Sequence, residues 1–254
     1  MLHKVIHGSD DKPPLLISHG LFGSGRNWGV ISKRLSDMRQ VLAVDLRNHG
    51  LSPWTARHRY SDMAEDMAEV ISAHKAPMDV MGHSMGGKAA MMLALTRPEL
   101  VRRLIIADIA PVNYGHDQTQ HIKNMRKVDL SQVKKRSDAT EQLAKHISDP
   151  LLQSFFTQSL DITASAWRLN LDTLERDMPD ILAFPEMDTA FAKPTLFLSG
   201  ADSDYVTPAY RPTIRRLFQK AKFAKIPNAG HWLHADAPRA LEASVRAFLS
   251  MALP

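Results

Sequence analysis

The stretch VMGHSMGGKAAMMLAL, residues 80–95, places one serine between two glycines at the point where the apolar pattern changes its period. The residues before Ser84 form a short apolar run that is typical of a buried strand, whereas those after it are small or apolar at helical spacing. The pattern therefore predicts that Ser84 lies on a strand-to-helix turn. Glycines at 82 and 86 would remove the side chains that clash in so tight a turn.

The pentapeptide Gly82-His83-Ser84-Met85-Gly86 has the form G-x-S-x-G, which makes a nucleophile elbow when it joins a strand to a helix. In that setting the serine hydroxyl is exposed above the sheet. It also lies at a helix N-terminus, whose dipole favours negative charge. The alternative interpretation is an ordinary glycine-rich turn in which Ser84 only caps the helix.

Apolar strands and helical segments alternate along the rest of the chain. The pattern predicts strands at residues 15–18, 41–45, 78–82, 104–108, 195–199 and 223–226, and helices at 28–35, 62–74, 85–96, 209–218 and 239–251. Such alternation favours right-handed crossovers and an α/β fold, with a mostly parallel sheet covered by helices on both faces. We expect the chemistry at the carboxyl ends of the strands.

The alternation is interrupted between about residues 112 and 193. This range reads as helices without a convincing strand, at residues 118–128, 139–147, 151–160 and 164–177. We expect it to form a small helical cap inserted after the strand that ends at Asp108. The expected core then comprises residues 1–111 and 194–254, and the cap comprises residues 112–193.

A serine hydroxyl needs a neighbouring base to become a nucleophile, so one of the twelve histidines should accept its proton. In enzymes with a nucleophile elbow the chain order is serine, acid, histidine. The predicted last strand is followed by the sequence IPNAGH, which ends at His231 and precedes the final helix. His231 is therefore the expected base, and His234 is expected to be structural.

The acid that orients the histidine has more than one candidate. Its usual place is the turn after the penultimate strand, but GADSDYV at residues 200–206 has Ser203 at the expected position, flanked by Asp202 and Asp204. The other known place is the end of the strand after the elbow helix, where the chain has Asp108. We favour Asp108 and keep Asp204 and Asp202 as alternatives.

Ester cleavage also requires donors for the oxyanion, which come from two backbone N–H groups. One is expected from Met85, directly after the nucleophile. The other is expected from the glycine-rich turn SHGLFGSG at residues 18–25, where Leu21 is favoured and Phe22 is the alternative. The same turn lacks the spacing of a nucleotide-phosphate loop.

The composition limits the remaining function classes. The chain of 254 residues has no cysteine, which excludes disulfides, zinc–thiolate sites and a cysteine nucleophile. The net charge of +5 comes from scattered basic residues, so nucleic-acid binding is not expected. No apolar run approaches the roughly 18 residues of a membrane span, and the beginning of the sequence has no signal-peptide pattern. We expect a cytoplasmic protein that uses no metal or cofactor.

Five stretches together resemble a known family: HGLFGSGRNW (19–28), DLRNHGLSPW (45–54), GHSMGGKAAM (82–91), DIAPVNY (108–114) and GHWLHADAP (230–238). They are similar to the YbfF-like esterases of the α/β-hydrolase superfamily, and the similarity covers nearly all of the chain. It implies the α/β-hydrolase fold and a carboxylesterase-type serine hydrolase that acts on a small-molecule ester or acyl thioester. It also supports Asp108 as the acid, because members of this branch lack the usual acid after the penultimate strand.

Two other functions remain compatible with the sequence. The GSGRNW turn is also similar to the synthase of menaquinone biosynthesis, which performs an elimination, and the fold could instead serve a ligand-binding receptor with slow turnover. For the esterase we expect short to medium acyl chains, no nucleic-acid or membrane partner, and either a monomer or a homodimer.

Overall fold

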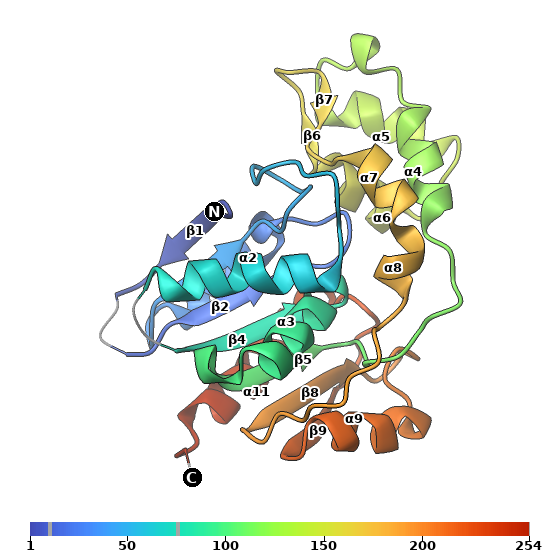
Figure 1. Cartoon of the computed structure of the whole chain (residues 1–254). Helices are drawn as coiled ribbons and strands as arrows, with labels where there is room; N and C mark the ends of the chain where they lie inside the picture. Colours follow the sequence, from blue (N-terminus) through green and yellow to red (C-terminus); the bar gives the residue numbers. More distant parts are fainter. Residues whose placement is uncertain (10–11, 75–76, 254) are drawn as a thin grey trace.

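The computed structural model describes residues 1–9, 12–74 and 77–253, which fold around a seven-stranded sheet (Figure 1). The strand order is β1-β3-β2-β4-β5-β8-β9, and each neighbouring pair is parallel except β1 and β3. The strands are β1 (Lys4–His7), β2 (Leu15–Ser18), β3 (Val41–Val44), β4 (Met78–His83), β5 (Val101–Ala107), β8 (Thr195–Gly200) and β9 (Ala221–Ile226). The predicted mostly parallel sheet is confirmed.

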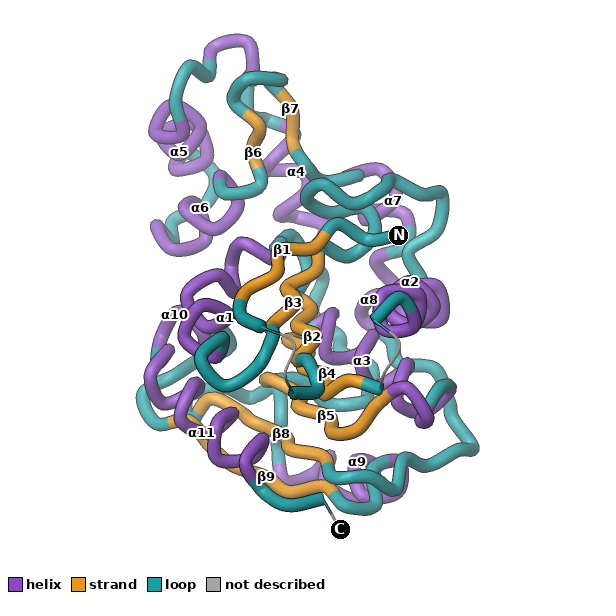
Figure 2. The backbone as a smooth tube through the Cα atoms, turned by 90° about the vertical axis from the view of Figure 1, so that its left-hand side faces the viewer, coloured by secondary structure: helices purple, strands orange, loops and turns teal. Residues whose placement is uncertain are grey.

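Helices cover both faces of this sheet, as Figure 2 shows. One apolar core joins the sheet to α1 and α11, and the other joins it to α2, α3 and α9. These helices are α1 (Gly29–Leu35), α2 (Tyr60–Ser72), α3 (Met85–Thr96), α9 (Arg211–Leu217) and α11 (Pro238–Ser250), and a short α10 (Leu233–Asp236) precedes α11. Single turns of 3-10 helix lie at Gly25–Trp28, Pro98–Leu100, Leu130–Gln132 and Pro208–Tyr210.

The apolar runs of the central strands explain why they were predictable. Strands β2, β3 and β4 are buried along their whole length, as expected for strands covered on both faces. Strand β1 was not predicted, because it lies at the edge of the sheet. Its apolar side chains Val5 and Ile6 are 38% and 45% exposed, so they lack the continuous apolar run of the central strands.

The range between β5 and β8 carries five helices and a two-stranded hairpin within the described residues, and it lies to one side of the sheet (Figure 1). The elements are α4 (Thr119–Arg126), α5 (Arg136–Ala144), α6 (Pro150–Thr157), β6 (Leu160–Asp161), β7 (Ala166–Trp167), α7 (Leu171–Arg176) and α8 (Met178–Leu182). The strandless interpretation of this range and the helix predicted at residues 164–177 were wrong. Trp167 instead pairs with Leu160, and α7 begins only after Asn170.

Contacts with the rest of the chain explain this difference. Gly50 N–H donates to the Arg168 carbonyl at 2.8 Å, and Asn170 N–H donates to the Asn48 carbonyl at 3.0 Å. The backbone around β7 is therefore held extended by a turn far away in sequence, and a local helical pattern could not reveal this.

The hairpin region also contacts the turn after β2. Ser159 donates its hydroxyl hydrogen to the Phe22 carbonyl at 2.7 Å. Further along, residues 184–193 contact the helices that flank the sheet: Thr189 donates to the Leu95 carbonyl of α3, and Phe191 N–H donates to the Leu217 carbonyl of α9. The range between β5 and β8 is thus joined to the rest of the fold at several separate points.

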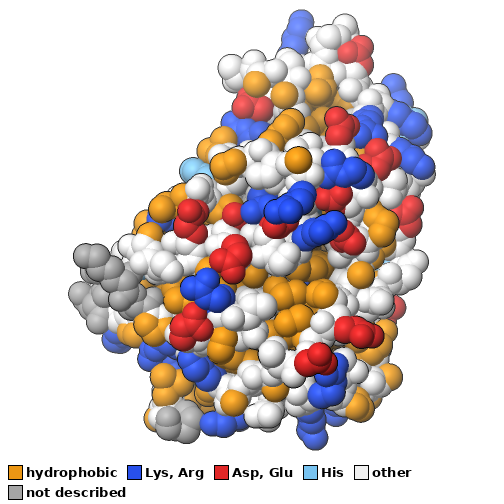
Figure 3. All heavy atoms as spheres, viewed as in Figure 1, with side chains coloured by type: hydrophobic (Ala, Val, Ile, Leu, Met, Phe, Trp, Pro, Cys, Tyr) orange, Lys and Arg blue, Asp and Glu red, His pale blue; other side chains and the backbone are white. Residues whose placement is uncertain are grey.

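The surface mixes charges of both signs. On the face in Figure 3, basic and acidic side chains alternate with apolar ones. Among the described residues, no helix is both long and apolar enough to cross a membrane.

Candidate active site

Ser84 lies between the end of β4 and the start of α3, in a backbone conformation that L-residues rarely adopt. Its φ and ψ are 51° and −121°, and such strain is typical of functional sites. The flanking glycines permit the turn: a Cβ on Gly82 would lie 2.3 Å from the Gly86 carbonyl oxygen, and one on Gly86 would lie 2.4 Å from the His19 carbonyl oxygen. Within the described part of the chain the Ser84 side chain makes no capping hydrogen bond to α3, which disfavours a capping role.

The His231 imidazole lies between Ser84 and Asp108. Its Nε2 is 3.0 Å from Ser84 Oγ, and its Nδ1 is 2.8 Å from Asp108 Oδ2. A carboxylate only accepts hydrogen bonds, so Nδ1 carries the proton and the Nε2 lone pair faces the serine hydroxyl. Tyr205 stacks on the imidazole, with ring centroids 3.9 Å apart and an angle of 20° between the planes.

The Asp108 carboxylate is fully buried at the end of β5 and is held by donors from the turn after β8. Its Oδ1 accepts from Gly200 N–H at 3.0 Å, and its Oδ2 accepts from the Ser203 hydroxyl at 2.5 Å. Ser203 thus occupies the usual position of the acid, in the turn after β8, and donates a hydrogen bond to Asp108. Asp202 and Asp204 are exposed, and within the described residues neither forms a hydrogen bond with His231.

The two candidate amides in the turn after β2 differ in their partners. Phe22 N–H already donates to His49 Nε2 at 3.2 Å, whereas Leu21 N–H donates to no acceptor within the described residues. Met85 begins α3, so its N–H has no acceptor inside the helix. The geometry therefore leaves Leu21 and Met85 as the free donors beside Ser84.

Two buried imidazoles support this turn, although the sequence did not indicate such a role for either. His19 Nε2 accepts from Leu46 N–H at 2.9 Å, and its Nδ1 donates to the Gly20 carbonyl at 2.8 Å. His49 Nδ1 donates to the Arg47 carbonyl at 3.0 Å, which leaves its Nε2 free to accept from Phe22. Burial lowers the pKa of His19 to about 4 and the pKa of His49 to about 3, so both rings are neutral near pH 7.

These pKa values predict loss of stability in acid. Between about pH 6.5, the ordinary pKa of histidine, and about pH 4, the unfolded chain binds protons that the folded chain excludes. The free energy of unfolding should therefore be greatest above pH 6.5 and fall as the pH drops towards 4. His49→Gln can still accept from Phe22 N–H but does not titrate, so urea unfolding between pH 4 and pH 8 should depend less on pH. The exposed His146→Gln is the control, and equal slopes in both variants would contradict the prediction.

A cavity of about 270 Å³ opens beside Ser84. Trp232, which follows His231 in the sequence, lines this cavity and packs against Phe155, with ring centroids 5.7 Å apart. Lys88 also lines the cavity; its side chain is 1% exposed, and burial lowers its pKa to about 7. The sequence motif included this lysine, but nothing in the pattern indicated that its amine is buried.

No group of three or more histidine, aspartate or glutamate side chains suited to a metal ion occurs in residues 1–9, 12–74 and 77–253. The polar side chains around Ser84 instead form hydrogen bonds with one another, from Asp108 through His231 to Ser84.

The chain is similar to known proteins over most of its length. A family model described as alpha/beta hydrolase fold matches residues 13–238. The chain is 37% identical to the sn-1-specific diacylglycerol lipase ABHD11 of Mus musculus, and the match covers 98% of this chain and 84% of that protein. It is 34% identical to the esterase YbfF of Escherichia coli, with 93% of each protein covered.

The chain is also similar to a solved structure over nearly its whole length. The chain superposes on a marine microorganism esterase with a TM-score of 0.92 and 36% identity, over 97% of this chain and 98% of that one.

Proposed function

Because the chain belongs to the α/β-hydrolase fold family, we propose that this hydrolase is a serine esterase with Ser84, His231 and Asp108 as its catalytic triad. The observation that carries the proposal is the pair of hydrogen bonds made by His231, 3.0 Å to Ser84 and 2.8 Å to Asp108. The esterase and lipase names of relatives that match over nearly the whole chain support the same reaction class.

In the first half of the reaction, Ser84 Oγ attacks the acyl carbonyl carbon while His231 Nε2 takes the hydroxyl proton. The charge that develops on the carbonyl oxygen is stabilised by the N–H groups of Met85 and Leu21. The Asp108 carboxylate stabilises the imidazolium that forms. His231 then protonates the leaving alcohol or thiol, and the acyl group stays on Ser84.

In the second half, water replaces the alcohol. His231 takes a proton from the water, whose oxygen attacks the acyl carbon, and the same proton returns to Ser84 Oγ as the acid is released. Every proton that leaves Ser84 or water thus passes through His231 Nε2. The scheme requires no cofactor.

The cavity supports short to medium acyl chains as substrates. Its volume of about 270 Å³ lies just below the roughly 300–1,000 Å³ typical of small-molecule sites. We also propose that residues 112–193 act as a cap over this cavity, because α4, α6 and α8 contribute lining side chains such as His121, Phe155 and Leu182.

A covalent probe tests the proposal directly. A fluorophosphonate should add to one serine, and peptide mass spectrometry should find the adduct on Ser84, because its hydroxyl lies 3.0 Å from the Nε2 of His231. Preincubation with a p-nitrophenyl ester or an acyl-CoA thioester should slow labelling if that compound is a substrate. An adduct on another serine, in enzyme that hydrolyses esters, would contradict the assignment.

A further inference from the structure

Lys88 lies one helical turn after Ser84 and makes contacts that the triad does not explain. Its Nζ donates to the carbonyl oxygens of Leu182 and Ala183, each at 2.8 Å. It also lies 4.8 Å from the centre of the Tyr114 ring, within the range of a cation–π contact. A buried ammonium group is costly unless it is paired, so these partners fix the position of the amine.

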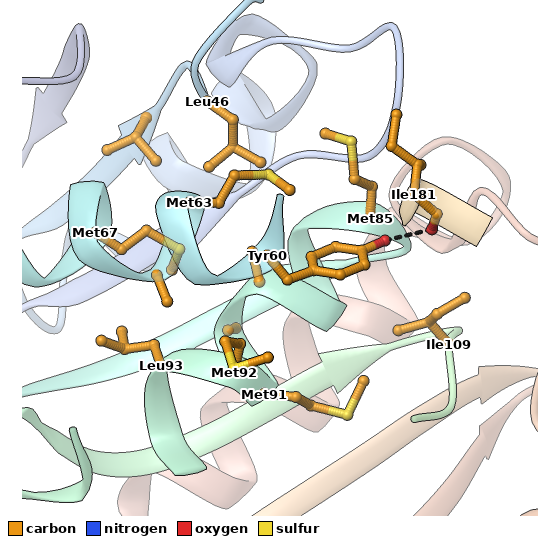
Figure 4. Packing of buried hydrophobic residues seen from close by; sticks show 14 of the residues in the cluster. Leu46, Tyr60, Met63, Met67, Met85, Met91, Met92, Leu93, Ile109 and Ile181 are labelled. Carbon is orange, nitrogen blue, oxygen red and sulfur yellow. Dashed lines mark hydrogen bonds between the residues drawn. The ribbon is translucent and has the colours of Figure 1, made fainter. Parts of the chain in front are cut away.

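The carbonyls that Lys88 binds belong to the end of α8. The last carbonyl oxygens of a helix accept no hydrogen bond from within the helix. Here neighbouring elements supply the donors. Tyr60 donates to the Ile181 carbonyl at 2.5 Å, as Figure 4 shows, and Tyr114 N–H donates to the Leu182 carbonyl at 3.0 Å. Lys88 is a further donor to this segment, and its hydrogen bonds link the end of α8 to α3.

Tyr114 and Leu182, which Lys88 contacts, lie between two cavities. The cavity beside Ser84 is lined by Tyr114 and Leu182, and so is a second, more open cavity of about 590 Å³. The second cavity is also lined by the apolar side chains of Met178, Pro179 and Ala183 and by the polar or charged side chains of Asn113, Asp117, Thr119, Glu175 and Arg176. Tyr114 and Leu182 therefore form a shared wall, and the Lys88 amine contacts both of them from the Ser84 side.

The wall lies on the acyl side of the proposed reaction. His231 must protonate the leaving group, so the alcohol lies near His231 and the neighbouring Trp232. The acyl chain extends from Ser84 in the other direction. Lys88 is four residues after Ser84 on α3 and therefore lies on the same face of the helix.

We propose that Lys88 determines acyl-chain specificity: its bonds to α8 keep Leu182 against Tyr114 and close the acyl end of the cavity. The second cavity is the space that longer chains would enter if this wall opened. The inference rests on the proposed esterase function. It assigns Lys88 no part in the chemistry at Ser84.

Two variants open the wall in different ways. Lys88→Met keeps a long apolar side chain but removes the donors to Leu182 and Ala183, whereas Leu182→Ala removes the side chain of the wall itself. The exposed Lys145 at the end of α5 gives a matched control, Lys145→Met, outside the cavity. Each variant is assayed with p-nitrophenyl butyrate and p-nitrophenyl octanoate, and thermal unfolding is measured in parallel.

In both wall variants, the ratio of kcat/KM for octanoate to kcat/KM for butyrate should rise by about tenfold or more over wild type. Tenfold corresponds to about 1.4 kcal/mol, which is what burial of about two further methylene groups supplies. The gain should appear mainly as a lower KM for octanoate. Lys145→Met should keep the wild-type ratio.

The outcomes separate this inference from the proposed function. If folded Lys88→Met and Leu182→Ala keep the wild-type ratio while hydrolysis still depends on Ser84, the inference is wrong and the esterase proposal stands. A shift in Leu182→Ala but not in folded Lys88→Met would overturn the role of Lys88. If Lys88→Met does not fold, Lys88→Gln takes its place: the shorter, uncharged amide cannot bind both carbonyls as the amine does, so an unchanged ratio in folded Lys88→Gln would overturn the role of Lys88. Wild-type protein that hydrolyses neither ester would instead overturn the proposed function.

Discussion

Replacing Ser84 with alanine is expected to lower kcat for p-nitrophenyl ester hydrolysis by about 10⁴- to 10⁶-fold. Loss of a triad nucleophile in serine hydrolases has effects of this order, and the residual rate comes from the oxyanion donors and binding alone. Ser84 Oγ is the hydroxyl that faces His231 Nε2, at 3.0 Å. Steady-state kinetics with p-nitrophenyl butyrate provides the measurement.

The Ser84→Ala result needs a control for folding and for contaminating esterases. The exposed Ser137→Ala on α5 changes the same atoms away from the cavity and should keep the wild-type rate. Purified side by side, the two variants differ only in which hydroxyl is absent. A Ser84→Ala protein that retains more than about 1% of wild-type kcat would disprove the nucleophile assignment.

The second large effect concerns the acid. Asp108→Asn should lower kcat by about 10²- to 10⁴-fold, because an amide supplies no negative charge for the imidazolium and favours the wrong tautomer of His231. Asp108 also receives the Gly200 N–H and the Ser203 hydroxyl, so the substitution disturbs a buried set of donors. The loss should appear in kcat for p-nitrophenyl butyrate measured by steady-state kinetics, because the missing charge acts on the imidazolium of the transition state.

Two neighbouring aspartates provide matched comparisons. Asp204→Asn and Asp202→Asn make the same chemical change on exposed side chains of the turn after β8. Both should keep kcat within about threefold of wild type, since surface substitutions that contact no functional group have small effects. A crippling effect of Asp204→Asn together with an active Asp108→Asn would reverse the assignment of the acid.

The sequence was sufficient where one local pattern determines the geometry. Two glycines around Ser84 require a tight turn, and the parallel strands that end before Asp108 and His231 bring both residues to the same edge of the sheet. It favoured Asp108 but could not exclude Asp202 and Asp204, because the choice depends on which carboxylate the folded turns leave beside the imidazole. The distance of 2.8 Å from His231 favours Asp108.

Features that depend on contacts between distant segments were missed or left open. From the sequence, Phe22 N–H is an alternative oxyanion donor. In the fold it donates instead to His49 Nε2 at 3.2 Å. The hairpin at Trp167 was read as helix because its extended backbone is held by Gly50 and Asn48, more than a hundred residues earlier. Nothing in the sequence indicated that the Lys88 amine is buried against the end of α8.

The bond from Ser159 to the Phe22 carbonyl limits how this enzyme could be re-engineered. Phe22 follows Leu21, the proposed oxyanion donor, so the segment between α6 and β6 supports the turn that we propose to receive the developing charge. Grafting residues 112–193 from another hydrolase would therefore exchange a support of this turn together with the proposed cap. A successful chimera would need a donor at position 159 and an extended segment to pair with Gly50, whatever acyl group it was built to accept.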